Sequence, residues 1–157
     1  MHLTFDDTTT WRFISDQVMG GASEGAAELR HEDGRSFAAL RGEVSTDNGG
    51  GFLQVRREVE GLPKETRALA FDVRGNGEMY EVHLRTVNSD RPWHYYTARF
   101  TAPAHWETVT LPLSDFESNG RGLTAELRPQ DLRGIGLVAY GRDYTARLDM
   151  AQIETVD

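Results

Sequence analysis

Hydrogen-bonding side chains recur at alternate positions in short segments of this sequence. Gln54 is followed by Arg56 and His83 by Arg85, in two runs that alternate between polar and apolar residues. Alternate residues of a strand point to the same face of a sheet, and Arg, Gln, His and Tyr together suit a polar ligand. The predicted ligand-binding face comprises Gln54, Arg56, His83, Arg85, Trp93 and Tyr96, with Asp72 and Arg74 as candidate additions. The alternative is a solvated face with cross-strand charge pairs.

Two glycine-rich segments form a second candidate site. The run from Ser15 to Ser23 places Met19 among small and polar residues, and Asn48–Phe52 contains three consecutive glycines. A methionine in such a loop either plugs the end of a sandwich or provides an adaptable contact for a protein partner. The candidate partner-contact residues are Asp16, Gln17, Met19, Gly20, Gly21, Asn48, Gly50 and Phe52.

No motif identifies a catalytic residue. Gly21–Gly25 matches G-x-S-x-G around Ser23, but a nucleophile elbow requires a buried strand before it and a helix after it, and neither is predicted here. None of the five histidines is spaced as a metal-ligand pair. We therefore predict no cofactor, with a structural Ca²⁺ held by Asp6, Asp7 and Asp149 as the less favoured alternative.

Composition excludes several classes of protein. The net charge of −8 and pI of about 5.1 argue against nucleic-acid binding. The absence of cysteine excludes disulfides and thiolate sites, and no apolar run reaches the roughly 18 residues of a membrane span. Met1–Phe5 lacks the pattern of a signal peptide, so we expect a bacterial cytoplasmic protein.

Turn signals separate short alternating segments along the whole chain, which predicts an all-β sandwich or barrel in a single domain, residues 1–157. The mostly apolar run Ile135–Tyr140 predicts a central strand covered on both faces, and Gly75-Asn76-Gly77 predicts a hairpin. Single helical turns are expected near Ser114 and Pro129. The predicted strands are Phe52–Val59, Ala68–Arg74, Tyr80–Thr86, Tyr95–Thr101, Glu107–Leu113, Ile135–Tyr140 and Leu148–Val156.

The sequence also resembles the thirty-kilodalton complex I intermediate-associated protein family. The resemblance begins with Trp11 and the run Ser15–Ser23, and continues in order over nearly the whole chain. Its later pieces are Gly42–Val44, Asn48–Phe52, Arg56, Asp72–Gly77, Tyr80, Trp106–Val109, Leu111–Leu113 with Phe116, and Ile135-Gly136. It implies a galactose-binding-like jelly roll, related to carbohydrate-binding modules, in a family whose mitochondrial members assist assembly of respiratory complex I without established enzyme activity.

Two functional hypotheses follow, and both describe a non-catalytic domain. The favoured one is a protein-binding assembly factor or chaperone. Its partner would be respiratory-complex subunits, reached peripherally at the inner membrane and contacted through the Ser15–Ser23 and Asn48–Phe52 segments. The alternative is a carbohydrate- or small-ligand-binding module that uses the Arg56 and Arg85 face. An enzyme is the third possibility, because sites assembled from distant residues escape a motif search.

Overall fold

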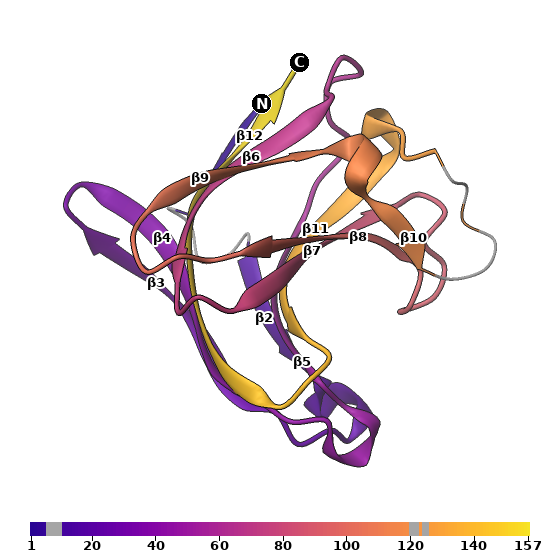
Figure 1. Ribbon diagram of the computed structural model, residues 1–157. Helices are drawn as coiled ribbons and strands as arrows, with labels where there is room; N and C mark the ends of the chain where they lie inside the picture. Colours follow the sequence, from indigo (N-terminus) through magenta and orange to yellow (C-terminus); the bar gives the residue numbers. More distant parts are fainter. Residues whose placement is uncertain (6–10, 120–122, 124–125) are drawn as a thin grey trace.

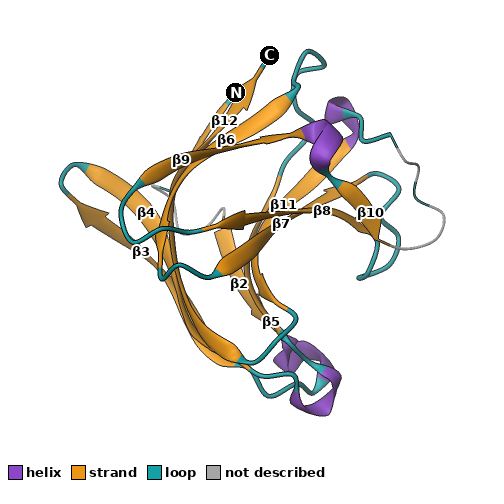
Figure 2. Ribbon diagram, viewed as in Figure 1, coloured by secondary structure: helices purple, strands orange, loops and turns teal. Residues whose placement is uncertain are grey.

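The structure is a computed structural model that describes residues 1–5, 11–119, 123 and 126–157. Its strands form two antiparallel sheets that pack face to face (Figures 1 and 2), which confirms the predicted all-β jelly-roll sandwich. The strands are β1 His2–Thr4, β2 Trp11–Ser15, β3 Glu24–Glu32, β4 Arg35–Val44, β5 Phe52–Glu58, β6 Ala68–Gly75, β7 Met79–Thr86, β8 Tyr95–Thr101, β9 Glu107–Pro112, β10 Glu117–Asn119, β11 Leu132–Tyr140 and β12 Tyr144–Val156.

The first sheet, sheet A, has the order β3-β4-β12-β6-β9. The long strand β12 bridges the sheet: its first half pairs with β4, and β1 pairs with residues 152–154. A register shift between Met150 and Ile153 interrupts the pairing with β6. The two ends of the chain lie side by side, because the Met1 amino group donates to Thr155 Oγ1 at 2.6 Å.

The second sheet, sheet B, has the order β10-β8-β7-β11-β5-β2. The predicted central strand, β11, lies between β7 and β5. The register of β11 brings Arg56 of β5 and His83 of β7 to the same level of the sheet, because Gly136 lies opposite both of them. One face of β11 packs into the core between the sheets, and the other lines a cleft. Residues 134–139 are nevertheless buried on both faces, with Val138 of the outer face only 1% exposed, which confirms the predicted doubly covered strand except at Tyr140.

Period-two alternation explains the core. In β7 the side chains of Tyr80, Val82 and Leu84 are buried in the core, and the residues between them point to the outer face of sheet B. Sheet A contributes residues such as Phe71 to the same core, where the centroids of the Phe71 and Phe100 rings lie 5.9 Å apart. The apolar half of each strand therefore builds the sandwich, and the other half is free to form a site.

Two local expectations have different outcomes. Gly75–Gly77 joins β6 of sheet A to β7 of sheet B, so the predicted hairpin is wrong. The N–H groups of Gly75 and Gly77 instead donate to the carbonyls of Pro103 and Ala102, and the turn forms a corner between the sheets. The helical turns are confirmed as 3-10 turns, η3 Leu113–Asp115 and η4 Pro129–Asp131; two more, η1 Asp16–Met19 and η2 Asp47–Gly49, were not expected.

Candidate functional site

A cleft of about 840 Å³ lies on the outer face of sheet B. Its floor is formed by β5, β11 and β7, with residues of β8 and β10 at one side. Along β11 the lining runs from Gly134 to Tyr140, which is about 20 Å at the rise of an antiparallel strand. Figure 2 shows the helical turns near β5 and the strand β10 on the same side of the sandwich.

In the middle of the floor, β11 contributes two glycines. Gly134 and Gly136 both line the cleft and alternate with inward-pointing residues of β11. A Cβ at Gly136 would lie 2.9 Å from Gln54 Oε1, so Gln54 extends across the position that a side chain would take. Because Arg56 and His83 flank Gly136 in register, the glycine makes room for the Gln54 amide between two further hydrogen-bonding side chains.

His83 is fixed from two sides. Its Nε2 lies 2.8 Å from Glu81 Oε1, and its ring stacks on Tyr95 with 3.9 Å between centroids. Burial alone would raise the pKa of Glu81, but hydrogen bonds from His83 and Thr97 lower it below its ordinary value. The ionised carboxylate only accepts hydrogen bonds, so Nε2 of His83 carries a proton that it donates to Glu81.

Arg85 organises one end of the cleft. Its guanidinium donates to the backbone carbonyls of Ser89, Arg91 and Pro92 at 2.9 to 3.2 Å. Asn119 Nδ2 donates to the Trp93 carbonyl at 2.7 Å, so the loop that presents Trp93 is anchored from two strands. The Trp93 side chain remains 55% exposed and lines the cleft.

Asp16 organises the opposite end. Its side chain is fully buried and accepts four hydrogen bonds: from the Ser23 hydroxyl at 2.5 Å and from the N–H groups of Ser23, Gly51 and Phe52 at 2.6 to 3.1 Å. Burial alone would raise the pKa of Asp16, but these four donors lower it below its ordinary value. We call this arrangement the Asp16 clasp, because it joins the Ser15–Ser23 segment to the Asn48–Phe52 segment.

The glycines of both segments leave room for the clasp. A Cβ added to Gly21 would lie 2.5 Å from Asp16 Cγ, and one added to Gly50 would lie 2.6 Å from Asp16 Oδ2. Gly20 adopts a left-handed φ of 82° and caps η1 with its N–H. Much of the unusual composition of these segments therefore serves the enclosure of one carboxylate.

The predicted partner-contact residues divide into buried and exposed groups. Asp16 cannot touch a partner directly, and Gly21 and Gly50 pack against it, so direct contact through Asp16 is corrected to a positioning role. Met19 is 62% exposed and its neighbour Val18 is 76% exposed. Gln17 uses its amide to bond the Ser23 carbonyl at 2.8 Å.

The remaining members of that set differ in their relation to the cleft. Asn48 is exposed with a left-handed φ of 59°, and neither Asn48 nor Gly20 lines the cleft, whereas the half-buried Phe52 does. Met19, Gly50 and Phe52 line the same cleft as Arg56 and His83. The two sites predicted separately are thus the two parts of one continuous surface.

The predicted ligand face is assembled with two corrections. Gln54, Arg56, His83, Arg85 and Trp93 all line the cleft. Tyr96 does not: its side chain is 1% exposed and lies in the core, so its placement on this face is wrong. The side chain of Tyr95, one residue earlier in β8, points to the outer face of sheet B and lines the cleft instead.

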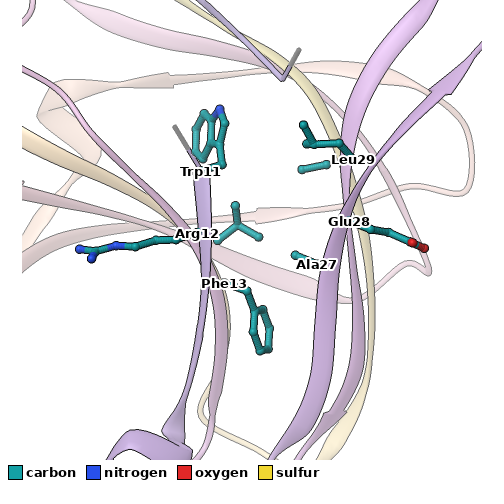
Figure 3. Close-up of a pocket in the computed structure, with 8 residues that line it drawn as sticks. Trp11, Arg12, Phe13, Ala27, Glu28 and Leu29 are labelled. Carbon is teal, nitrogen blue, oxygen red and sulfur yellow. The ribbon is translucent and has the colours of Figure 1, made fainter. Parts of the chain in front are cut away.

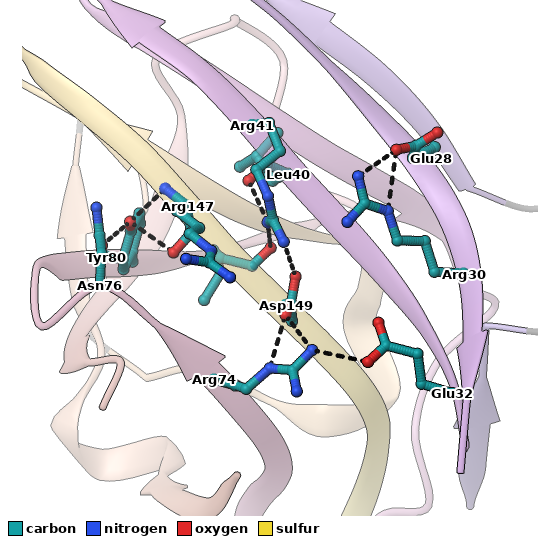
Figure 4. Close-up of polar contacts among 11 residues, drawn as sticks. Glu28, Arg30, Glu32, Leu40, Arg41, Arg74, Asn76, Tyr80, Arg147 and Asp149 are labelled. Carbon is teal, nitrogen blue, oxygen red and sulfur yellow. Dashed lines mark hydrogen bonds and ion pairs between the residues drawn. The ribbon is translucent and has the colours of Figure 1, made fainter. Parts of the chain in front are cut away.

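The candidate additions Asp72 and Arg74 belong to the other sheet, because β6 is part of sheet A. There Arg74 pairs with Asp149 at 2.8 Å, and Arg41 donates to the same carboxylate at 2.7 Å (Figure 4). Asp149 is 1% exposed and is enclosed by these two arginines, which leaves it unsuited to Ca²⁺.

Asp6 and Asp7 lie outside the described residues. Within residues 1–5, 11–119, 123 and 126–157 there is no group of three or more His, Cys, Asp or Glu side chains arranged to hold a metal ion. The same ranges contain no helix that is long and apolar enough to cross a membrane.

Ser23 is buried, and its hydroxyl is used by the clasp: it donates to Asp16 and accepts from the Ser45 N–H at 2.9 Å. These bonds give Ser23 a structural role, consistent with its interpretation as a loop residue.

A smaller pocket of about 110 Å³ lies between β2 and β3, lined by residues such as Trp11, Phe13 and Leu29 (Figure 3). It is below the range of roughly 300–1,000 Å³ typical of ligand sites, so the sheet-B cleft is the stronger candidate.

Comparison with known proteins supports this fold. The model of the complex I intermediate-associated protein 30 (CIA30) family matches residues 3–150. A comparison with curated proteins finds no match. Among solved structures, the family 11 carbohydrate-binding module of the cellulase Lic26A-Cel5E of Clostridium thermocellum is similar, with a TM-score of 0.76 and 13% identity over 98% of this chain and 92% of that chain.

A second structure of a Clostridium thermocellum family 11 module, in complex with a β-1,3-1,4-mixed-linked tetrasaccharide, gives a TM-score of 0.77 at 13% identity over 99% of this chain and 95% of that one. The K1 cleaved adhesin domain of Lys-gingipain from Porphyromonas gingivalis W83 is also similar, with a TM-score of 0.59 and 9% identity over 99% and 96% of the two chains. At these identities the likeness shows the jelly-roll fold alone.

Proposed function

The chain belongs to the complex I intermediate-associated protein 30 family, and from that premise we propose that it is a non-catalytic binding domain that holds a saccharide-like polar ligand in the sheet-B cleft. The observation that carries this proposal is the group of hydrogen-bonding side chains, Gln54, Arg56 and His83, on the glycine-containing floor of the cleft. A flat polar ring can lie on such a floor while these side chains bond its hydroxyl groups.

The aromatic side chains of the cleft favour a ring-shaped ligand. Trp93 is 55% exposed and Tyr140 is 43% exposed, and both line the cleft. The apolar faces of a sugar ring pack on such surfaces, and the indole and phenol groups also have a polar end. The hydroxyls of Tyr95 and Tyr140 contact each other, and burial followed by this contact raises the pKa of Tyr95. Tyr95 therefore remains a neutral hydrogen-bonding group.

Ligand binding is tested by isothermal titration calorimetry with a panel of neutral oligosaccharides, including a β-1,3-1,4-mixed-linked tetrasaccharide. Trp93→Ala should weaken binding at least about fivefold, because it removes an exposed aromatic surface from the cleft. Val156→Ala, which truncates an exposed apolar residue of sheet A, is the control and should bind like the wild type. The absence of binding by any saccharide at millimolar concentration would contradict the proposal.

A second function, assembly of a respiratory complex through a protein partner, is favoured by the family and by the apolar tip of η1. Val18 and Met19 are 76% and 62% exposed, and the Asp16 clasp holds their segment in one conformation. Exposed apolar side chains on a pre-organised loop are suited to a protein contact, because little conformational entropy is lost on binding.

The partner hypothesis is tested by affinity purification of the tagged protein from its own cells, with and without detergent, followed by mass spectrometry. Met19→Ser should reduce the recovery of a respiratory-complex subunit, since it removes an apolar contact. Met79→Ser is the matched control, because Met79 is also exposed and does not line the cleft. Equal recovery with both variants would remove the η1 tip as the contact.

A further inference from the structure

The charge of the sheet-B cleft is opposite to that of the whole protein. The chain carries a net charge of −8, yet none of the described residues that line the cleft is Asp or Glu. The charged side chains in the lining are Arg56 and Arg85, and His83 lies next to Arg56 across Gly136. The described lining of the cleft therefore carries only positive formal charge, and the carboxylate of Glu81, outside the lining, lies 2.8 Å from His83.

The two arginines differ in what they bind. Arg85 donates to three backbone carbonyls and is committed to the Trp93 loop. The Arg56 guanidinium forms neither a hydrogen bond nor an ion pair with the residues that the structure describes. Glu58, the carboxylate nearest to it along β5, is instead 3.4 Å from Arg12, and Glu81 is bound by His83 and Thr97.

The surroundings of Arg56 make its charge unfavourable in the absence of a ligand. Burial, followed by repulsion from Arg85 and Arg12, lowers the pKa of Arg56, and Glu58 opposes this only in part. The side chain is half-buried, and a partly desolvated guanidinium with five donors and no acceptor raises the free energy of the folded state. An anion in the cleft would supply the missing acceptor and relieve the repulsion between the arginines.

We infer that the ligand of this cleft is an acidic saccharide, whose carboxylate or phosphate group binds the Arg56 guanidinium while its ring lies over the floor formed by Gln54, Gly134 and Gly136. This inference rests on the proposed saccharide function and adds the charge of the ligand. Planar, two-pronged binding of an oxyanion is the interaction for which arginine is suited. Arg85 acts as a positioning residue for the loop that presents Trp93.

The test compares neutral and acidic probes in pairs of matched size by calorimetry: galactose trimer with galacturonate trimer, and galactose with galactose 6-phosphate, with inorganic phosphate followed by NMR. Wild-type protein should bind at least one acidic probe about tenfold more tightly than its neutral counterpart, and this preference should weaken as salt is added. The uronate and phosphate arms identify which oxyanion is bound.

Arg56→Gln should abolish the preference for the acidic probe, because it lowers the affinity for the acidic probe about tenfold more than the affinity for its neutral counterpart. Arg147→Gln makes the same charge change on the exposed face of sheet A and should retain the preference. Arg56→Lys keeps the charge without the planar fork and should retain part of it. The melting temperature of Arg56→Gln should equal or exceed that of the wild type, since an unpaired cation is removed; a structural role for Arg56 would lower it.

The possible contrary results overturn the inference in different ways. Equal affinity of the wild type for neutral and acidic trimers would refute the acidic ligand and leave the saccharide function standing. An acidic preference that survives Arg56→Gln would refute the role of Arg56 and also leave the saccharide function standing. No binding of any saccharide, together with no NMR shift at the cleft on addition of phosphate, would refute both.

Discussion

Replacing Asp16 by asparagine tests whether one buried carboxylate holds the end of the cleft together. Oδ1 accepts the Ser23 N–H, and Oδ2 accepts the Ser23 hydroxyl and the N–H groups of Gly51 and Phe52. An amide has one oxygen, so the NH₂ group of the substituted side chain must face at least one N–H donor. Hydrogen bonds to a charged group contribute about 1.5–3 kcal/mol each and are not additive, so we expect the free energy of unfolding to fall by about 2–4 kcal/mol.

Urea unfolding measured at several pH values gives this loss and its origin. The pKa of Asp16 is lower in the folded protein than its value of about 3.9 in an unfolded chain. The stabilisation is therefore complete above about pH 4 and is lost as the pH falls through the folded-state pKa. The difference between wild type and Asp16→Asn should be constant near neutral pH and should shrink in acid.

Asp47→Asn is the matched control, because Asp47 is an exposed carboxylate in the neighbouring turn. A surface substitution of this kind should change the free energy of unfolding by less than about 0.5 kcal/mol. If Asp16→Asn were no more destabilising than Asp47→Asn, or if its effect did not depend on pH in acid, the clasp would not be held by an ionised carboxylate.

Three further outcomes are expected. Gly21→Ala should lower the melting temperature more than Gly34→Ala, because its Cβ would lie 2.5 Å from Asp16, whereas Gly34 has open space and only a left-handed φ; equal shifts by differential scanning calorimetry would contradict close packing at Gly21. Gly136→Val should abolish saccharide binding in calorimetry and leave the circular dichroism spectrum unchanged, because the added side chain displaces the Gln54 amide and takes up space on the floor of the cleft; retained affinity would refute the position of the ligand. Arg85→Gln should speed hydrogen exchange in the 89–93 loop and change Trp93 fluorescence, since three carbonyls lose their donor; an unchanged exchange rate would show that Arg85 does not hold the loop.

The sequence predicts which residues share a face of one strand, but not which sheet the strand joins. Gln54, Arg56, His83 and Arg85 were placed together correctly because period-two alternation fixes their parity within β5 and β7. Asp72 and Arg74 show the same alternation, but their strand β6 belongs to sheet A, so they lie on a different surface. The wrong prediction of a hairpin at Gly75–Gly77 has the same cause, since a glycine turn can join two strands of one sheet or the two layers of a sandwich.

The error at Tyr96 has a different origin. Two adjacent tyrosines begin β8, and both are compatible with an aromatic, half-buried strand, so composition does not decide which of them points outward. The register does: Tyr96 lies opposite Leu84, whose side chain is in the core, and therefore shares its inward direction. A single step in parity moves a residue from the ligand face to the core.

The burial of Asp16 could not be predicted by a rule that places polar loop residues at the surface. A signal was nevertheless present, because glycines occur on both segments at the positions where side chains would collide with the carboxylate. Neither glycine has a left-handed φ, so turn geometry does not account for them. Glycines without a conformational reason indicate close packing against a neighbouring group.

The Asp16 clasp also limits how this domain can diversify. Its donors are the Ser23 hydroxyl and the N–H groups of Ser23, Gly51 and Phe52, so they come from both segments at this end of the cleft. A substitution at position 16 is therefore expected to alter the shape of the site and the stability of the domain together. Val18 and Met19 extend from the Ser15–Ser23 segment and are exposed. Changes of specificity at this end of the cleft are therefore expected to accumulate at positions 18 and 19, where side chains can vary at little cost in stability, while the motif around them stays fixed.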